Sequence, residues 1–362
     1  TAFLGVFSTL AYHSSILLPK NKKDAIYLLA SCIIFNIIFT ILVLLAFLIF
    51  KDFLLEIDDI NNLENYLLLI PLFVFFHGLF QTLRYWNTRL KNFKIIALSK
   101  ITEGLLSKTL NIGYGFYISN KVAGLIYGIL FASFFKNLIL FLSVKNHFKE
   151  FFNLSIKKVF EILKRYKKFP IFALPSELLS RLPAIIIVIF MLNYFDASIL
   201  GNYSLAITIL AVPTVFFTNS IIEAFSPRVA NAIHYNNHKK IIMDVYQRIF
   251  SLTFFVFIII MFFGDYLFSF LFGEEWAIAG IIAQILAFRS LFEVVTIPIL
   301  SLTSIVEKQE LGLYRRVLEI IATVLSFVLG SYFENYIYTF IMYSIFNSIV
   351  ISIISYKVII HI

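Results

Sequence analysis

The chain is poor in the residues on which disulfide-linked domains, metal sites and soluble surfaces depend. It contains one cysteine, Cys32, which lies in an apolar run; a single cysteine excludes an intrachain disulfide and argues against a cysteine-based metal site. The six histidines are scattered without the spacing of metal ligands. Only 14% of the residues are charged, well below the share in soluble globular domains. These absences predict no metal, no cofactor and no enzymatic centre, and they argue against a soluble globular protein.

Hydrophobic residues make up 60% of the chain and are grouped in long runs. Runs of about 20 apolar residues can cross a bilayer as α-helices. We predict a partial segment at 1–17 and complete segments at 25–50, 64–83, 95–117, 122–144, 170–192, 199–222, 247–269, 277–302, 312–332 and 336–356. The sequence therefore predicts an all-α polytopic membrane protein.

The loops between these segments alternate between basic and acidic. Basic residues cluster at 20–23, 84–100, 145–168, 228–248, 308–316 and Lys357, and acidic residues dominate 52–64, 265–275 and the loop at Glu334. Because Lys and Arg concentrate on the cytoplasmic side of membranes, we expect the basic loops and the C-terminus to be cytoplasmic. This topology accounts for the net charge of +9 without a nucleic-acid partner.

The basic linker at 145–169 divides the chain into an N-terminal transmembrane bundle at 1–144 and a C-terminal bundle at 170–362. Its apolar residues Val159, Ile162, Leu163 and Tyr166 fall on one helical face, and basic residues occupy the remainder. This pattern predicts an amphipathic helix that lies in the inner headgroup layer, with membrane lipids as its partners.

Short matches between the two halves indicate an internal repeat. Leu18-Pro19-Lys20 resembles Ser226-Pro227-Arg228, and Lys100-x-x-Glu103 resembles Arg316-x-x-Glu319, both with an offset of about 210 residues. The repeat predicts two six-helix bundles related by a pseudo-two-fold axis along the membrane normal. On this offset, one helix and part of another are expected before Thr1, so the N-terminal helix is missing from this chain.

Ionisable residues inside the apolar segments are the candidate functional groups. They are Glu103, Lys108, Lys136, Glu177, Arg181, Arg289, Glu293 and Glu319. Leaving all of them in lipid would cost on the order of 20 kcal/mol, more than a fold can spare. We therefore expect them to face one another or a water-filled cavity.

Two interpretations of these charges stay open. In the first they are structural: Glu177 with Arg181, and Arg289 with Glu293, are spaced to pair on one helical face, while Glu103, Lys136 and Glu319 anchor helix ends. In the second, Arg181, Arg289 and Lys108, together with Lys136, bind an anionic substrate in a cavity between the bundles. Guanidinium suits this role because it holds phosphate oxygens bidentately and stays charged. The four glutamates would then be counter-charges or coupling groups.

Prolines interrupt several segments. They lie at 170, 175, 183, 213 and 298. Proline in a transmembrane helix opens the backbone where a neighbouring helix or water can satisfy it. We expect bent helices, as alternating access requires.

An ordered set of motifs resembles one family. Phe169-Pro170, Pro175-Ser176-Glu177, Arg181-Leu182-Pro183 and Gly201-Asn202-Tyr203-Ser204-Leu205-Ala206 are similar to the seventh and eighth helices of polysaccharide repeat-unit flippases, the O-antigen and capsule transporters of the multidrug/oligosaccharidyl-lipid/polysaccharide (MOP) exporter superfamily. The loops at Ile16–Lys20 and Trp86-Asn87-Thr88-Arg89, and Phe272-Gly273 with Trp276, are similar to further parts of that family. The resemblance covers nearly the whole chain.

The resemblance implies a multi-pass transporter, and not an enzyme, in a bacterial inner membrane. It would flip an undecaprenyl-diphosphate-linked oligosaccharide by alternating access for the synthesis of surface polysaccharide, with other polysaccharide assembly proteins as further partners. Two alternatives stay open: a cation-coupled multidrug exporter of the same superfamily, which would use the four glutamates, and a membrane-embedded polysaccharide polymerase. The short external loops argue against the polymerase, because that chemistry needs a large catalytic loop outside the membrane.

Overall fold

The computed structural model describes residues 2–50, 64–117, 121–145, 155–232, 238–305 and 308–360. All regular structure within these residues is helical. The chain divides into two compact units, Thr1–Leu174 (unit 1) and Pro175–Ile362 (unit 2). The predicted all-α membrane fold is confirmed, whereas the acidic loop at 51–63 lies outside the described residues.

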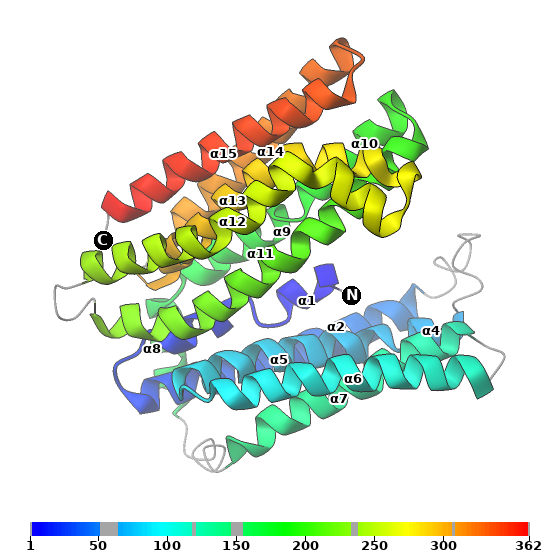
Figure 1. Cartoon of the computed structure of the whole chain (residues 1–362). Helices are drawn as coiled ribbons and strands as arrows, with labels where there is room; N and C mark the ends of the chain where they lie inside the picture. The colour runs from blue at the N-terminus through cyan, green and yellow to red at the C-terminus, as the bar shows by residue number, and fades with distance from the viewer. Residues whose placement is uncertain are drawn as a thin grey trace. The chain divides into compact units, whose positions relative to one another are not determined.

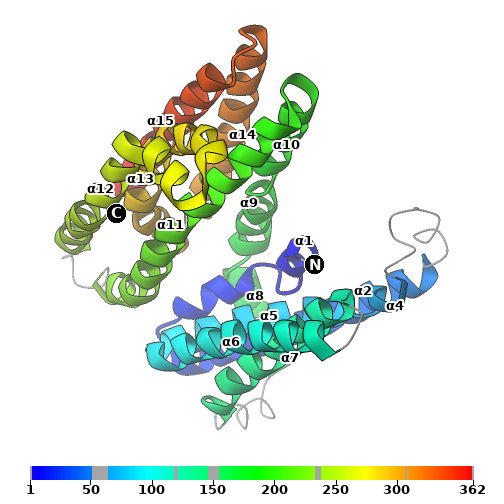
Figure 2. The same ribbon diagram turned by 45° about the vertical axis from the view of Figure 1, so that its right-hand side comes forward.

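Unit 1 is built from long helices that lie side by side in Figures 1 and 2. Its elements are α1 (Ala2–Phe7), η1 (Tyr12–Leu17), α2 (Lys22–Ile49), α4 (Glu64–Leu67), α5 (Ile70–Arg89), α6 (Phe93–Tyr117), α7 (Lys121–Leu142), α8 (Ile156–Arg165) and η4 (Phe169–Ala173). α5 packs against both α2 and α7, and α6 packs along α7. The core of this unit lies around Leu28, Leu83 and Trp86, which are fully buried.

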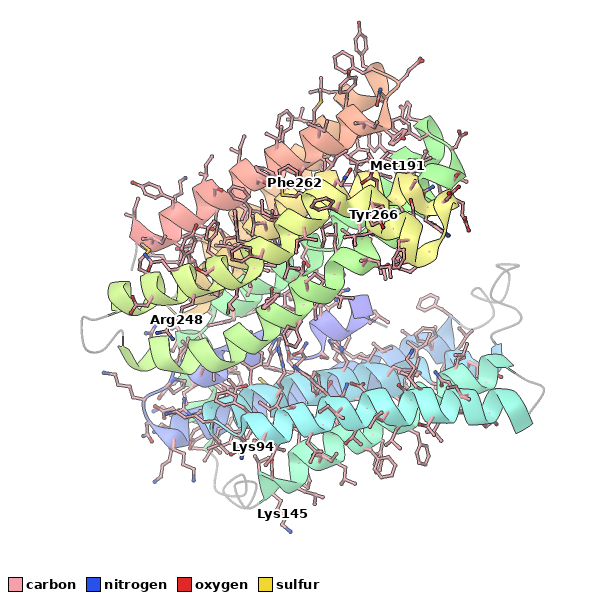
Figure 3. All side chains as sticks on the ribbon, viewed as in Figure 1. Lys94, Lys145, Met191, Arg248, Phe262 and Tyr266 are labelled. Atoms are coloured by element: carbon pink, nitrogen blue, oxygen red, sulfur yellow. The ribbon has the colours of Figure 1, made fainter. Side chains whose placement is uncertain are left out.

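Unit 2 is organised around one central helix. Its elements are α9 (Leu174–Leu179), which begins at the unit boundary, α10 (Leu182–Tyr194), α11 (Ala197–Ala232), α12 (His238–Phe272), η6 (Glu274–Trp276), α13 (Ala277–Ile305), α14 (Gln309–Tyr332) and α15 (Tyr336–Ile360). α13 packs against α11, α12 and α15, and α14 packs along α15 (Figure 1). The outer side of α12 is apolar and exposed, as at Phe262 and Tyr266 (Figure 3), which suits a helix that faces lipid.

Seven helical stretches of the described chain are long and apolar enough to cross a membrane. They are Lys22–Ile49, Ala123–Leu142, Phe169–Tyr194, Ala197–Thr218, Tyr246–Phe272, Glu274–Ile297 and Tyr336–Ile360. The protein is therefore a multi-pass membrane protein. The predicted segments in α5, α6 and α14 are helical over 20, 25 and 24 residues, but they are less apolar than these seven stretches. Several of the candidate functional groups lie in these more polar helices.

The predicted segment at 1–17 is not one continuous helix. α1 ends at Phe7, and a 3-10 helix follows at Tyr12–Leu17. Leu10 and Ala11 between them have φ values of 49° and 59°, in the left-handed region that cannot continue an α-helix. The polar residues at this break are satisfied locally, because Ser8 donates to the Gly5 carbonyl at 2.7 Å and Thr9 contacts the His13 ring at 2.6 Å.

The predicted helix at 170–192 is interrupted, as its prolines suggested. A π-helix at Phe169–Ala173 contains Pro170, and α9 ends at Leu179. A turn at 180–181 then separates α9 from α10, whose second residue is Pro183. By contrast, α11 continues through Pro213, so that proline does not end its helix.

The helix boundaries agree with the internal repeat. The first residues of α6 and α14, Phe93 and Gln309, are 216 positions apart. Because α6 packs along α7 and α14 packs along α15, the two units also share this helix pairing.

The predicted amphipathic helix exists as α8, but its main apolar face has a different partner. Ile162 is buried, and Val159, Leu163 and Tyr166 pack against the core of unit 1. The Tyr12 hydroxyl donates to the Leu163 carbonyl at 3.1 Å. This face therefore packs on protein and not on acyl chains, and the location of α8 in the headgroup layer stays a prediction.

Candidate functional site

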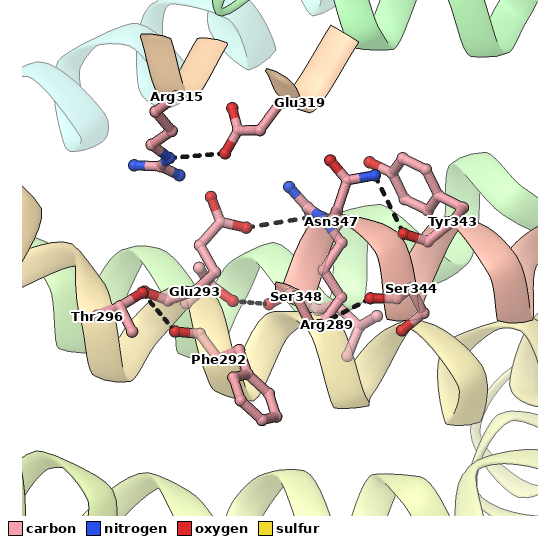
Figure 4. Close-up of polar contacts among 12 residues, drawn as sticks. Arg289, Phe292, Glu293, Thr296, Arg315, Glu319, Tyr343, Ser344, Asn347 and Ser348 are labelled. Atoms are coloured by element: carbon pink, nitrogen blue, oxygen red, sulfur yellow. Dashed lines mark hydrogen bonds and ion pairs between the residues drawn. The ribbon is translucent and has the colours of Figure 1, made fainter. Parts of the chain in front are cut away.

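A cluster of alternating charges lies among α13, α14 and α15 in unit 2 (Figure 4). On α14, Glu319 accepts a hydrogen bond from Arg315 Nε at 2.6 Å and another from Arg316 Nη1 at 2.7 Å. The side chains of Arg315 and Glu319 are only 7% and 3% exposed. The three residues share one helical face because their spacings are i to i+3 and i to i+4.

The central helix α13 adds a second pair to this cluster. Arg289 Nη1 lies 3.1 Å from Glu293 Oε2, again at a spacing of four residues. The Arg289 guanidinium also lies over the Tyr343 ring of α15, 5.3 Å from its centroid. Glu293 faces Arg315, and Glu319 is close enough to Arg289 for their charges to interact (Figure 4). The two pairs therefore form one electrostatic unit across two helices.

α15 lines the cluster with buried polar side chains. They are Tyr343, Ser344, Asn347 and Ser348, each at most 4% exposed. The Ser344 hydroxyl donates to the Ile285 carbonyl of α13 at 2.9 Å, which ties the two helices together beside Arg289. Asn347 donates to the Tyr343 carbonyl at 3.0 Å. This side of the cluster is therefore polar and held in place by hydrogen bonds.

The cluster has an excess of positive charge. Three guanidinium groups, those of Arg289, Arg315 and Arg316, face the two carboxylates of Glu293 and Glu319. Arg289 Nε is buried and has no hydrogen-bond partner among the described residues. Arg289 and Arg316 keep 16% and 28% of their side chains exposed, so both remain accessible. The arrangement can accept an anion with several oxygen atoms, because guanidinium groups donate in parallel pairs.

Unit 1 holds a smaller charged site between two helices. Lys136 of α7 donates to Glu103 of α6. The Lys136 ammonium also lies over the Phe80 ring of α5, 4.1 Å from its centroid. Ser133 completes the site with a hydroxyl 3.4 Å from Glu103. This pair is neutral overall and joins α6 to α7.

The structure therefore brings together Arg289, Glu293 and Glu319 in unit 2, and Glu103 with Lys136 in unit 1. Lys108 is exposed on α6, on a face it shares with Ile101 and Leu105. Arg181 is exposed at the turn before α10, and Glu177 is half-buried on α9. The turn at 180–181, which contains Arg181, follows the helix that carries Glu177, and the pairing of the two residues stays a prediction. That Lys108, Arg181 and Arg289 line one cavity stays a prediction.

Sequence reasoning missed Arg315 and Arg316 as site residues, because it used them only as markers of the cytoplasmic side although the predicted segment at 312–332 contains both. In the structure both lie in the second turn of α14, which begins at Gln309. The signal was present in the sequence: Arg315 and Arg316 precede Glu319 by four and three residues, the spacing at which helical charges pair. Among the described residues, no group of three or more His, Cys, Asp or Glu side chains could hold a metal ion.

Comparison with known proteins identifies the family. A family model described as polysaccharide biosynthesis protein matches residues 1–281, most of the chain. The chain belongs to this family. Among curated proteins, no match to the sequence was found. The resemblance noted from the helix motifs is thus supported by a match that spans unit 1 and much of unit 2.

Solved structures show that the chain has the fold of MOP superfamily transporters. The MATE transporter VcmN from Vibrio cholerae, in its bent form, matches with a TM-score of 0.76 at 14% identity, over 99% of this chain and 84% of that chain. A MOP superfamily transporter from Pyrococcus furiosus matches with a TM-score of 0.77 at 13% identity, over 99% and 83%. A MATE protein in complex with MaL6 matches with a TM-score of 0.77 at 14% identity, over 99% and 83%.

Proposed function

We propose that this protein is a flippase that moves an undecaprenyl-diphosphate-linked oligosaccharide across the bacterial inner membrane for the synthesis of surface polysaccharide. The observation that carries the proposal is the buried cluster on α13 and α14, in which three guanidinium groups face two carboxylates. A cation-rich site inside a membrane protein suits a doubly charged diphosphate that bare lipid would reject. The family match supplies the link to polysaccharide.

The residues of the cluster have different roles in binding the diphosphate. Arg289 and Arg316 are partly accessible and donate to the diphosphate oxygens. Buried Glu319 accepts from both Arg315 and Arg316 and so holds the two guanidinium groups in place. Glu293 holds the Arg289 guanidinium until substrate arrives and then serves as its counter-charge on release. Binding and release by the same site are what alternating access requires.

The site argues against the alternative of a cation-coupled drug exporter. A pocket for cationic drugs or coupling cations needs an excess of carboxylates, whereas this cluster has an excess of guanidinium groups. The MOP superfamily transporter from Pyrococcus furiosus is described as having a binding pocket of reversed polarity that suggests a different function. This description shows that pocket charge can differ within the shared fold.

Complementation of a flippase-null strain tests the proposal. The full-length gene should restore surface polysaccharide, and Arg289→Ala should abolish it while the protein still inserts into the membrane. Arg248→Ala is the matched control, because Arg248 is an exposed arginine of α12 (Figure 3). Normal polysaccharide from Arg289→Ala would contradict the proposal, as would restored drug resistance without restored polysaccharide.

A further inference from the structure

The amphipathic helix α8 has a second apolar surface that the protein does not cover. Ile156 and Phe160, one helical turn apart, are 75% and 68% exposed. We call this pair the α8 apolar edge. It lies beside the face through which Val159 and Ile162 pack on the core of unit 1, since successive residues of a helix are rotated by about 100°. An exposed Phe and Ile side by side are costly in water and indicate a partner.

Lysines follow the α8 apolar edge on its other side. Lys157 and Lys164 are exposed, and both lie next to Phe160 around the helix. The order around α8 is thus a face packed on protein, an apolar edge and a row of lysines. Apolar side chains bordered by lysines are typical of a helix at the boundary between acyl chains and headgroups.

Contacts to α2 place α8 at the level of that boundary. The backbone amide of Ser155 donates to the Tyr27 hydroxyl at 3.3 Å. Lys158 lies 3.8 Å from Asp24 and over the Tyr27 ring, 5.9 Å from its centroid. Both Asp24 and Tyr27 lie within the first two turns of the membrane span Lys22–Ile49, so α8 lies beside the polar end of a transmembrane helix.

We propose that α8 docks unit 1 onto anionic phospholipids, with Ile156 and Phe160 inserted into the leaflet and Lys157 and Lys164 bound to the headgroup phosphates. Apolar insertion anchors the helix, and each lysine near an anionic surface adds to the attraction. The partner is the lipid of the leaflet on the basic side of the membrane. This assignment is independent of the transported substrate.

Fluorescent probes on the full chain in nanodiscs test the docking. Cys32 is the only cysteine, so a Cys32→Ser background allows single cysteines at Phe160→Cys and, as the matched control, Glu161→Cys on the exposed polar side. An environment-sensitive dye at position 160 should show blue-shifted emission and quenching by brominated lipids, and the dye at position 161 should show neither. A water-like signal at position 160 in every lipid would overturn the proposal.

Lipid charge tests the role of the lysines. Replacing part of the phosphatidylcholine by phosphatidylglycerol should strengthen docking, and Lys157→Gln with Lys164→Gln should weaken it in that mixture by roughly thirtyfold. Lys94→Gln with Lys145→Gln is the control, since both lysines are exposed near the ends of α6 and α7 (Figure 3). An unchanged phosphatidylglycerol effect in the Lys157 and Lys164 variant would overturn the proposal. Thermal unfolding is the control for folding: if every variant unfolds at the wild-type temperature, a change in docking is not caused by misfolding.

Discussion

Glu103 of unit 1 and Glu319 of unit 2 occupy equivalent positions, but their charges are balanced in different ways. Each lies ten residues after the first residue of its helix, α6 or α14. Glu103 pairs with Lys136 on the neighbouring helix α7. Glu319 pairs with Arg315 and Arg316 of its own helix. Both units thus have a carboxylate at this position, and the ion pairs described for it come from a neighbouring helix in unit 1 and from its own helix in unit 2.

The difference has a mechanical and a chemical consequence. A pair between two helices resists any movement of one along the other, so Glu103 and Lys136 hold α6 to α7. A pair within one helix moves with that helix, so α14 can shift against α13 without breaking its ion pairs. Chemically, the guanidinium groups of unit 2 stay charged and present planar pairs of donors that match phosphate oxygens. Unit 2 therefore has the permanent charge that an anion site needs.

The largest expected effect comes from removing the carboxylate of unit 2. Glu319→Gln leaves two guanidinium groups without their partner at a position that is 3% exposed, and we expect a loss of about 4 kcal/mol in unfolding free energy. Glu103→Gln should cost about 1 kcal/mol, because Glu103 is 30% exposed. Thermal or denaturant unfolding in detergent measures both. If the two variants lose the same unfolding free energy, Glu319 and Glu103 depend equally on their ion pairs, and the proposed difference between the units is wrong.

A charge exchange tests whether unit 1 depends on the contact between its helices. Lys136→Glu alone places two carboxylates together and should destabilise the protein by about 2 kcal/mol. Adding Glu103→Lys restores opposite charges across α6 and α7, so most of the loss should be recovered. The double variant is compared with both single variants. If the double variant loses as much unfolding free energy as the two single variants lose together, the ion pair does not hold α6 and α7 together.

A smaller effect concerns how closely the helix pairs approach. Gly330 of α14 lies against Thr339 of α15, where an added Cβ would come within 2.8 Å of the Thr339 Cα. In unit 1 the small residue is on the other helix, because Gly124 of α7 lies against Tyr114 of α6 and its added Cβ would be 2.8 Å from the Tyr114 Cβ. Tyr114 and Gly330 are again 216 positions apart.

Alanine at either close contact should therefore destabilise its own unit. We expect Gly330→Ala and Gly124→Ala each to cost about 1 kcal/mol, since overpacking outweighs the gain in helix propensity. Gly113→Ala is the control, because nothing lies within 4 Å of its added Cβ, and it should be neutral or slightly stabilising. Thermal unfolding distinguishes these outcomes. A stabilised Gly330→Ala variant would show that α14 and α15 are not held at this distance.

Much of the fold could be predicted because apolar runs and alternating loop charges directly reflect the membrane. The Arg289 and Glu293 pair was also predictable, since spacing within a helix fixes which side chains meet. Contacts between helices could not be predicted from the sequence. The contact of Lys136 with Glu103 and the position of Arg289 over Tyr343 depend on how the helices pack, which no local pattern encodes. The positions of the breaks at Ala11 and at 180–181 escaped for a similar reason, because a hydrophobic run does not show where its backbone leaves the helix.

The face of α8 shows the same limit. The sequence correctly grouped Val159, Ile162, Leu163 and Tyr166, but an apolar face has the same pattern whether lipid or protein covers it. The structure decides the partner, because the Tyr12 hydroxyl and the core of unit 1 lie against that face.

The most direct test of the guanidinium cluster is the binding of farnesyl diphosphate and farnesol to the purified protein in nanodiscs. We predict that wild-type protein binds the diphosphate and not the alcohol, and that Arg289→Gln weakens diphosphate binding by at least about tenfold, while Arg248→Gln leaves it unchanged. Equal binding of the diphosphate by wild-type protein and Arg289→Gln, or equal binding of the alcohol and the diphosphate by wild-type protein, would contradict the account.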